Sequence, residues 1–159
     1  MRGIYLSLGS NIGDRAQNIA QALELLPAHG VRVVKQSALY ETEPVELREQ
    51  DWFLNAVAEV ETDLQPQQLM QALLTIEQSM GRERLIPKGP RIIDLDILLF
   101  GSTVTKAPQL EIPHPRFTER RFVLVPFAEI APQAVHPRRG QTIQQLLDIT
   151  PDHSEVRRA

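Results

Sequence analysis

The sequence predicts an α+β protein with a ferredoxin-like α/β sandwich, in which helices pack on an antiparallel sheet. Three observations support this fold class. Strand-like and helix-like segments follow one another in the order β-α-β-β-α-β before a set of trailing elements. Each of the two long helical segments carries one apolar stripe, as expected of helices that cover a sheet. The 159 residues, 42% of them hydrophobic, can form a core of their own, so we expect a single domain over 1–159.

The first strand is expected over 4–8, where apolar residues precede the Gly9-Ser10-Asn11 break. A helix should follow, because Asp14 with Gln17 three residues later fits a capping arrangement. The helix would continue until Pro27 and Gly30. Its apolar residues recur with helical spacing, at Ile19, Ala22, Leu23 and Leu26.

The next two strands are predicted over 31–40 and 53–62, which are rich in β-branched and aromatic residues. The polar segment 41–52 between them is long for a hairpin loop, so we expect it to carry function. A second helix should begin near Pro66, which suits a first helical turn, and end at Gly81. Its buried face would be formed by Leu69, Leu73, Ile76 and Met80.

The remaining elements are a strand over 92–100, bounded by glycines, and then proline-rich connections. A short strand is predicted near 122–125. A last helix is predicted from Thr142, with Gln145 as its capping partner. The polar tail 152–159 is expected to be frayed.

Composition excludes several classes of partner. Lys and Arg number 17 against 20 Asp and Glu, a net charge of −3, so we expect no nucleic-acid partner. Cysteine is absent, which excludes disulfides and thiolate metal sites. No apolar run approaches the roughly 20 residues of a membrane span, and the start lacks a long apolar secretion segment. We therefore expect a cytoplasmic protein with no membrane association.

Two acidic residues interrupt the strand predicted over 92–100. Because strand side chains alternate, Asp94 and Asp96 should emerge on the same face while their apolar neighbours point to the other. A spacing of roughly 6–7 Å between their Cα atoms would let both carboxylates grip hard cations. Magnesium is the natural candidate, with phosphate oxygens and water completing its shell. The alternative is a solvated strand face, or surface ion pairs with arginines.

Basic residues precede this pair within a short span: Arg82, Arg84, Lys88 and Arg91. A cationic loop beside an anionic strand suits a polyphosphate, because cations bridge some oxygens and arginines hold others bidentately. The chain has no Gly-x-x-x-x-Gly-Lys-Ser/Thr motif, so the phosphate site would not be a Walker loop. A solvated basic loop is the alternative interpretation.

Two further groups of residues could bind a ligand. His114 lies between two prolines, on a stiff loop where its imidazole could meet a phosphate. Phe53 and Asn55 share a strand face and offer a ring and an amide to a flat heteroaromatic ligand. For both groups the alternative is structural: a hydrogen-bonding histidine, and an ordinary core phenylalanine with an amide bound to a loop. Trp52 points to the opposite face and is expected to be packing.

Five segments carry a family resemblance. They are 8–11, 40–45, 53–57, 89–99, and 112–116 with 120–126. Together they resemble the 6-hydroxymethyl-7,8-dihydropterin pyrophosphokinase family, whose members transfer diphosphate from ATP to a pterin alcohol in folate synthesis. The Gly-Pro-Arg to Asp-Leu-Asp segment within 89–99 is the most specific of the five.

The resemblance implies a role for each matching residue. Asp94 and Asp96 would hold two Mg²⁺ ions, and Arg82 and Arg91 would be catalytic with them. The residues implied for ATP binding are Glu77, Arg82, Arg84, Arg91, Ile97, His114 and Arg120. Those implied for pterin binding are Thr42, Pro44, Val45, Phe53, Asn55 and Phe122. The substrates would be ATP and 6-hydroxymethyl-7,8-dihydropterin, and the protein would act as a monomer.

Two positions depart from the family pattern. Pro87-Lys88 stands where an Arg-Trp pair is common, and Glu46 stands where glycine is common. Neither departure touches the carboxylate pair. Other functions left open by the residues are another magnesium-dependent transfer at a polyphosphate, by a nucleotidyl transferase or phosphohydrolase, and a non-catalytic nucleotide-sensing module.

Overall fold

The computed structural model describes residues 3–44, 51–81 and 92–159. The strands of the main sheet are β1 (Ile4–Ser10), β2 (Val31–Gln36), β3 (Tyr40–Thr42), β4 (Phe53–Thr62), β5 (Asp94–Phe100) and β8 (Val156–Arg158). The helices are α1 (Arg15–Leu25), α2 (Pro66–Ser79), α3 (Arg121–Ile130) and α4 (Ile143–Ile149), with 3-10 turns at Pro27–His29 and Phe117–Glu119. A separate hairpin is formed by β6 (Thr105–Ala107) and β7 (Leu110–Ile112).

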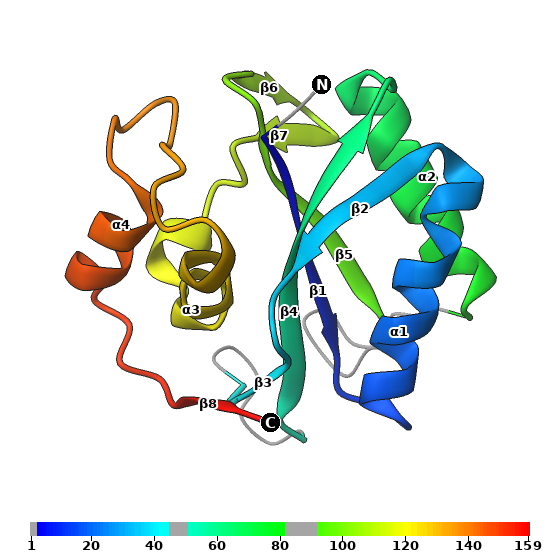
Figure 1. Cartoon of the computed structure of the whole chain (residues 1–159), viewed down its shortest axis with the longest axis horizontal. Helices are drawn as coiled ribbons and strands as arrows, with labels where there is room; N and C mark the ends of the chain where they lie inside the picture. The colour runs from blue at the N-terminus through cyan, green and yellow to red at the C-terminus, as the bar shows by residue number, and fades with distance from the viewer. Residues whose placement is uncertain (1–2, 45–50, 82–91) are drawn as a thin grey trace.

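The main sheet is antiparallel, with strand order β5-β1-β4-β3-β8, and β2 pairs with the other part of the same edge of β4. Figure 1 shows α1 and α2 on one face of this sheet and α3 and α4 on the other. The chain thus enters the sheet as β1-α1-β2-β3-β4-α2-β5, which confirms the predicted ferredoxin-like α/β sandwich. No helix in the described ranges is both long and apolar enough to cross a membrane.

The apolar residues form two clusters, one on each face of the sheet. One cluster joins α1 and α2 to inward residues of the strands, such as Leu6 and Leu54. The other joins α3 and α4 to residues of the opposite face, such as Tyr5 and Val57. Since neighbouring strand residues point to opposite faces, each central strand contributes to both clusters.

Helix termini follow the predicted capping pattern. The Asp14 carboxylate accepts a hydrogen bond from the Gln17 N–H at 3.1 Å, which caps α1. Thr142 and Gln145 form a reciprocal capping box at the start of α4. Pro66 occupies the first turn of α2, as expected.

Four expectations about elements were wrong. Segment 122–125 lies in α3, because Val123, Phe127 and Ile130 are buried together at helical spacing. The expected strand over 31–40 ends at Gln36, and β3 instead begins at Tyr40, inside the segment taken as its end and the following loop. The connection after β5 contains the β6–β7 hairpin. The tail is paired in the sheet as β8, because the free edge of β3 supplies it with partners.

Candidate active site

The two acidic residues of β5 lie as the alternation predicts. Asp94 and Asp96 are partly exposed, whereas Leu95 and Ile97 are buried in the cluster beneath α1 and α2. The backbone register with β1 shifts between Tyr5 and Leu6, beyond the pair, so it leaves the shared face of the carboxylates intact.

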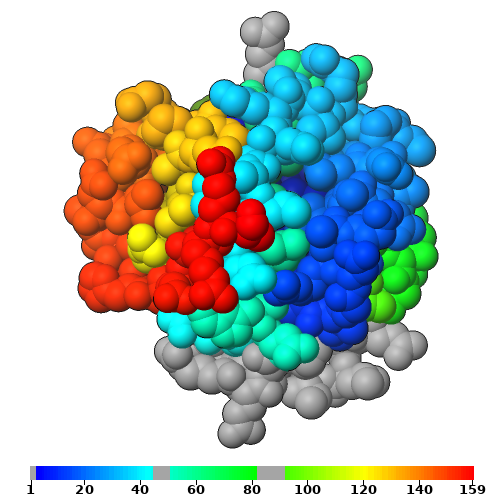
Figure 2. Space-filling view, turned by 60° about the horizontal axis from the view of Figure 1, so that its bottom comes forward, coloured from blue at the N-terminus to red at the C-terminus, as the bar shows by residue number. Residues whose placement is uncertain are grey.

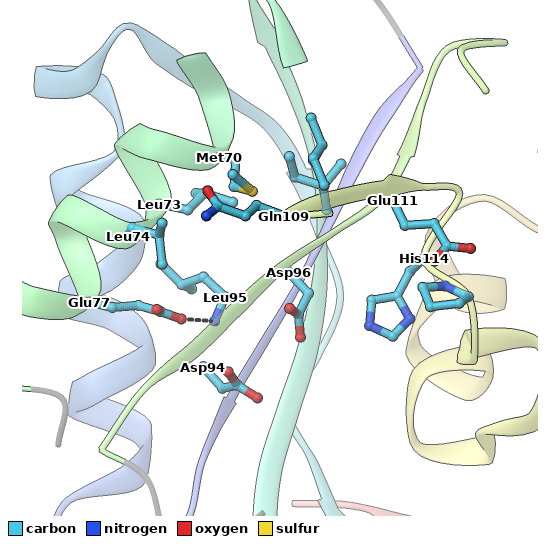
Figure 3. Close-up of a pocket in the computed structure, with 13 residues that line it drawn as sticks. Met70, Leu73, Leu74, Glu77, Asp94, Leu95, Asp96, Gln109, Glu111 and His114 are labelled. Carbon is cyan, nitrogen blue, oxygen red and sulfur yellow. Dashed lines mark hydrogen bonds between the residues drawn. The ribbon is translucent and has the colours of Figure 1, made fainter. Parts of the chain in front are cut away.

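A cleft of about 260 Å³ lies along β5. Its walls come from α2, from β5 and from residues 109–115, which include β7 and the loop that follows it. Figure 3 shows the carboxylates of Asp94 and Asp96 directed into this space, with the imidazole of His114 on the opposite side. Glu77 and Ile97 also line it. Four side chains that were predicted to bind ATP or metal, and the predicted Ile97, therefore share one cleft.

Glu77 joins α2 to β5. Its side chain is only 3% exposed, and its Oε2 accepts a hydrogen bond from the Leu95 N–H at 2.7 Å (Figure 3). Because β5 is an edge strand, the outward N–H groups on its free side need partners from outside the sheet. The carboxylate supplies one, between the two aspartates, and so fixes the segment that carries them.

His114 is neutral at pH 7. Burial lowers the pKa of its imidazole to about 4, and the positive charges of Arg120 and Arg116 act in the same direction, against the opposing effect of Asp94. The Arg116 N–H donates to Nδ1 at 3.3 Å, so the hydrogen of the neutral ring is assigned to Nε2. The His114 N–H also donates to the Leu98 carbonyl at 3.0 Å, which ties this loop to β5. The geometry gives a fixed neutral N–H donor in the cleft.

A second group of polar residues lies on the same sheet face as the aspartates. The Asn55 Nδ2 donates to the Thr42 Oγ1 at 2.6 Å, and both side chains are buried. Phe53 pairs with Thr42 across the sheet and is partly exposed. Gly9 pairs with Asn55 on one side and with Asp94 on the other, which places all of them on one face.

The separation of the two groups follows from the sheet. Asn55 and Asp94 are two strands apart, which is about 10 Å between their backbones at the usual strand spacing. The residue between them is a glycine, and a Cβ on Gly9 would lie 2.6 Å from the Asn55 Oδ1. The absence of a side chain at this position therefore keeps the amide in its place and leaves the carboxylates and the amide on one continuous surface.

The carboxylate pair fits a cation that takes its other ligands from a substrate. Within the described part of the chain, no group of three or more His, Cys, Asp or Glu side chains could hold a metal. Two carboxylates on one strand face suit Mg²⁺, which keeps several waters and commonly binds through one or two carboxylates and substrate phosphates.

Comparison with known families decides the class of protein. The model of the family described as 7,8-dihydro-6-hydroxymethylpterin-pyrophosphokinase matches residues 5–132. The chain belongs to this pyrophosphokinase family. The resemblance predicted from the five sequence segments is thereby confirmed.

Individual relatives of the family support the assignment. The chain is 46% identical over 148 residues to a 2-amino-4-hydroxy-6-hydroxymethyldihydropteridine pyrophosphokinase of Methylorubrum extorquens, covering 92% of each chain. It is 48% identical over 130 residues to the protein of the same name from Bacillus subtilis, covering 81% of this chain and 78% of that one. It is also 44% identical over 150 residues to the folic acid synthesis protein fol1 of Pneumocystis carinii. That match covers 94% of this chain but spans only 20% of the fungal protein.

Solved structures support the fold. An HPPK-DHPS structure in complex with substrates superposes with a TM-score of 0.71 over 91% of this chain and 42% of that one, at 16% identity. A Plasmodium falciparum HPPK-DHPS triple mutant gives a TM-score of 0.72 at 20% identity, over 91% of this chain and 43% of that one. At these identities the superpositions show that the chain shares the fold of the matched part of those proteins, and nothing more.

The structure brings together only some of the residues predicted for the pyrophosphokinase site. Thr42, Asn55 and Phe53 form one group, as described above, and Pro44 is buried two residues beyond Thr42. The Arg120 guanidinium lies 5.7 Å from the centre of the Phe122 ring, at the start of α3, and its charge acts on His114 of the cleft. Four predicted residues lie outside the described ranges: Val45, Arg82, Arg84 and Arg91. The same holds for the departures at Glu46 and Pro87-Lys88.

Sequence reasoning missed two features of the site. Gly9 was taken as part of a turn, whereas it ends up between the polar groups inside β1. Trp52 was taken as simple packing, but its ring lies 4.7 Å from the Arg157 guanidinium. For Gly9, the available signal was a glycine at the end of a strand, next to strands predicted to bind ligands. For Trp52 the sequence holds no signal, because Arg157 lies 105 positions away.

Proposed function

We propose that the chain transfers diphosphate from ATP to the hydroxymethyl group of 6-hydroxymethyl-7,8-dihydropterin. The products would be AMP and the pterin diphosphate, a step in tetrahydrofolate synthesis. The observation that carries the proposal is the common sheet face, on which the carboxylate pair and the Thr42–Asn55 pair lie two strands apart. Family membership and the names of the bacterial relatives support it.

The nucleotide would occupy the cleft along β5. Asp94 and Asp96 would hold two Mg²⁺ ions, and bound Mg²⁺ would offset the negative charge of the phosphates and favour attack at phosphorus. The neutral His114 would donate its Nε2–H to a phosphate oxygen. Ile97 and Glu77 line the same cleft and would border the nucleotide. Arg82, Arg84, Arg91 and Arg120 remain proposed contacts to ATP.

The pterin would bind over the second group of residues. Asn55 has a donor and an acceptor that suit the edge of a pterin ring, and Thr42 fixes the orientation of the amide. Phe53 would stack on the ring, with Phe122 opposite it. Pro44 and the backbone of Val45 complete the proposed pterin contacts.

Catalysis by this arrangement would depend on positioning and charge. The pterin hydroxyl oxygen would attack the β phosphorus, and the bond from that phosphorus to the oxygen bridging it to the α phosphorus would break. AMP would leave, and the hydroxyl proton would pass to solvent. Because both substrates would be held on one sheet face, by groups whose backbones are about 10 Å apart, the reaction would gain from orientation rather than from a covalent enzyme intermediate.

We further propose that residues 1–159 act as one pyrophosphokinase domain, as a monomer, in the cytoplasm. The relatives from Methylorubrum extorquens and Bacillus subtilis are matched over 92% and 78% of their length, which supports one domain over this range. Two plant relatives are named mitochondrial, so the compartment differs among relatives. Light scattering on the purified chain would measure its oligomeric state, and a mass of twice 18.0 kDa would contradict the monomer.

The deciding experiment is a product assay with ATP, Mg²⁺ and the reduced hydroxymethylpterin, in which AMP is separated from ADP. AMP and pterin diphosphate should form in equal amounts and only when the pterin is present. AMP or ADP formed without the pterin would indicate a different polyphosphate transfer or a hydrolase. Binding of both ligands without turnover would indicate a non-catalytic module.

The carboxylates are tested in the same assay. The double variant Asp94→Asn/Asp96→Asn keeps the side-chain shape but removes both charges, so turnover should fall by at least about 100-fold. Asp63→Asn, at an exposed residue outside the cleft, is the matched control and should leave turnover unchanged. Unchanged turnover in a folded double variant would contradict the assignment of the metal site.

A further inference from the structure

The C-terminal strand lies against the pterin side of the site. β8 pairs antiparallel with β3, so that Val156 is opposite Thr42. Next to this pair, the Glu43 N–H donates to the Glu155 carbonyl at 3.2 Å, and the Glu155 N–H donates to the Glu43 Oε1 at 2.9 Å. Figure 2 shows the C-terminal segment, in red, lying across the cyan residues that include β3. The segment is also beyond residues 5–132, the part matched by the family model.

Arg157 links the two strands that carry Thr42 and Phe53. Its guanidinium is 3.2 Å from the Glu41 carboxylate, beside Thr42, and 4.7 Å from the centre of the Trp52 ring, beside Phe53. Arg15 of α1 completes the connection, because its two terminal nitrogens donate to the Glu41 Oε1 and to the Trp52 carbonyl, each at 2.9 Å. These hydrogen bonds from Arg15 and Arg157 lower the pKa of the Glu41 carboxyl.

The same C-terminal segment also holds the start of α3. The Arg121 N–H donates to the Asp152 Oδ2 at 2.8 Å, and the Arg121 side chain donates to the Ser154 carbonyl at 3.2 Å. Asp152 thus satisfies a first-turn N–H of the helix with a carboxylate, which is favourable at a helix N-terminus. Phe122, the next residue, is the proposed second face of the pterin sandwich.

We propose that the segment 152–158 is a positioning strap for the pterin pocket, with Arg157 as its principal side chain. It binds β3, the start of β4 and the start of α3 together, and so sets the relative positions of Thr42, Phe53 and Phe122. The inference rests on the proposed function, because it assigns these residues to the pterin.

The need for a strap follows from the length of β3. A strand of three residues makes few ladder hydrogen bonds, and on the edge of a sheet it would be held from one side only. Pairing with β8 turns it into an internal strand. The Thr42 hydroxyl sets the orientation of the Asn55 amide. A small displacement of β3 would therefore weaken the binding of the pterin more than the binding of ATP.

The test compares two exposed arginine–glutamate pairs at opposite ends of β4. Arg157→Gln removes the pair with Glu41, and Arg32→Gln removes the pair with Glu61, which is paired across β2 and β4 at the far end. Arg157→Gln should raise the KM for the pterin by about 3- to 10-fold, the range expected from losing an exposed ion pair and a cation–π contact. The KM for ATP should stay unchanged. Arg32→Gln should change neither constant.

A second readout does not depend on turnover. Trp52 is the only tryptophan of the chain, so its emission reports directly on the contact with Arg157. Arg157→Gln should shift this emission in the unliganded protein, while Arg157→Lys, which keeps the charge but loses the planar guanidinium, should restore only part of the pterin affinity.

Three results would overturn the strap. They are an unchanged pterin KM in Arg157→Gln, an equal rise in both KM values, or a lower melting temperature with both constants at their wild-type values. The last result would mean that the segment only stabilises the fold. Failure of the proposed function is distinct, because the wild-type protein would then form no AMP in the presence of the pterin.

Discussion

At the scale of single residues, the geometry of the site depends on the absence of a side chain at Gly9. A Cβ at this position would lie 2.6 Å from the Asn55 Oδ1, closer than a Cβ approaches a neighbouring atom in folded proteins. Asn55 is buried and bound to Thr42, so its amide can yield only by losing that hydrogen bond. The requirement for glycine here is one of space and does not arise from backbone strain.

Gly9→Ala should therefore weaken pterin binding more than ATP binding. We expect the KM for the pterin to rise by about fivefold, which corresponds to about 1 kcal/mol for one lost hydrogen bond. Gly13→Ala is the control, because Gly13 has a positive φ of 69° but nothing near its Cβ position. It should cost stability through backbone strain without affecting the pterin. Steady-state kinetics with each substrate varied in turn makes the measurement, and equal effects on both substrates would contradict the steric argument.

The lowered pKa of His114 predicts that the stability of the protein depends on pH. The folded protein holds a proton on this imidazole less tightly than the unfolded chain, because its pKa is about 4 instead of 6.5. Its contribution is present above pH 6.5 and is lost progressively as the pH falls from 6.5 to 4. The loss should amount to at most about 3 kcal/mol of unfolding free energy.

Urea unfolding between pH 7.5 and 4.5 measures this effect. His114→Asn keeps an acceptor for the Arg116 N–H but cannot be protonated, so its stability should fall less steeply over this interval. His29→Asn, at a partly exposed histidine outside both the cleft and segment 152–158, serves as the control. Parallel curves for His114→Asn and wild type would show that His114 does not carry the pH dependence.

Sequence alone predicts the placement of residues that depends only on their near neighbours in the chain. Alternation in a strand is enough to place Asp94 and Asp96 on one face, and their outward direction is confirmed. Contacts between distant segments could not be predicted in the same way. The position of Gly9 between Asn55 and Asp94 depends on the order and register of three strands, which only the folded sheet defines.

At the scale of elements, the joint between α2 and β5 supports the carboxylates. The Glu77 carboxylate accepts the Leu95 N–H at 2.7 Å from a position that is almost fully buried. Glu77→Ala would leave that N–H unpaired, which should cost about 1–3 kcal/mol of unfolding free energy. It should also raise the KM for ATP, because Leu95 lies between the two aspartates.

Glu77→Gln separates the hydrogen bond from the charge. Its amide oxygen can still accept the Leu95 N–H, so it should recover part of the stability lost in Glu77→Ala. Thermal unfolding and ATP kinetics of both variants make the comparison. If Glu77→Gln were as unstable as Glu77→Ala, the hydrogen bond to Leu95 would not be what joins α2 to β5.

The helices that were predicted correctly have capping residues in their own sequence. The elements that were predicted wrongly owe their conformation to contacts with other parts of the fold. The capping residues Asp14 and Thr142 mark α1 and α4 in the sequence and in the structure. Segment 122–125 has β-branched and aromatic residues but becomes helical, since the helix buries Val123 and Phe127 on one side. β8 is polar and has no strand pattern, and it is ordered by the edge it pairs with.

At the scale of the whole molecule, the sheet is shared by two layers of helices. Leu54 and Val57 of β4 belong to opposite clusters, so neither cluster can lose its packing without disturbing the strands of the other. The proposal of one domain over 1–159 therefore predicts a single cooperative unfolding transition. Two probes can test it: far-UV circular dichroism follows the helices, and Trp52 emission follows the end of the sheet.

The sharpest version of this test places one cavity in each layer. Phe127→Ala removes a fully buried ring that lies 4.8 Å from Tyr5 and 5.8 Å from Phe117, between centroids, and should cost about 3–5 kcal/mol. Leu69→Ala removes a fully buried side chain of α2 from the other cluster and should cost about 2–5 kcal/mol of unfolding free energy. If the layers form one unit, each variant unfolds at a lower urea concentration than wild type, and within each variant both probes give the same midpoint. A Phe127→Ala transition that splits in two, with Trp52 emission unchanged while helix is lost, would show that α3 and α4 unfold separately from the rest of the sheet.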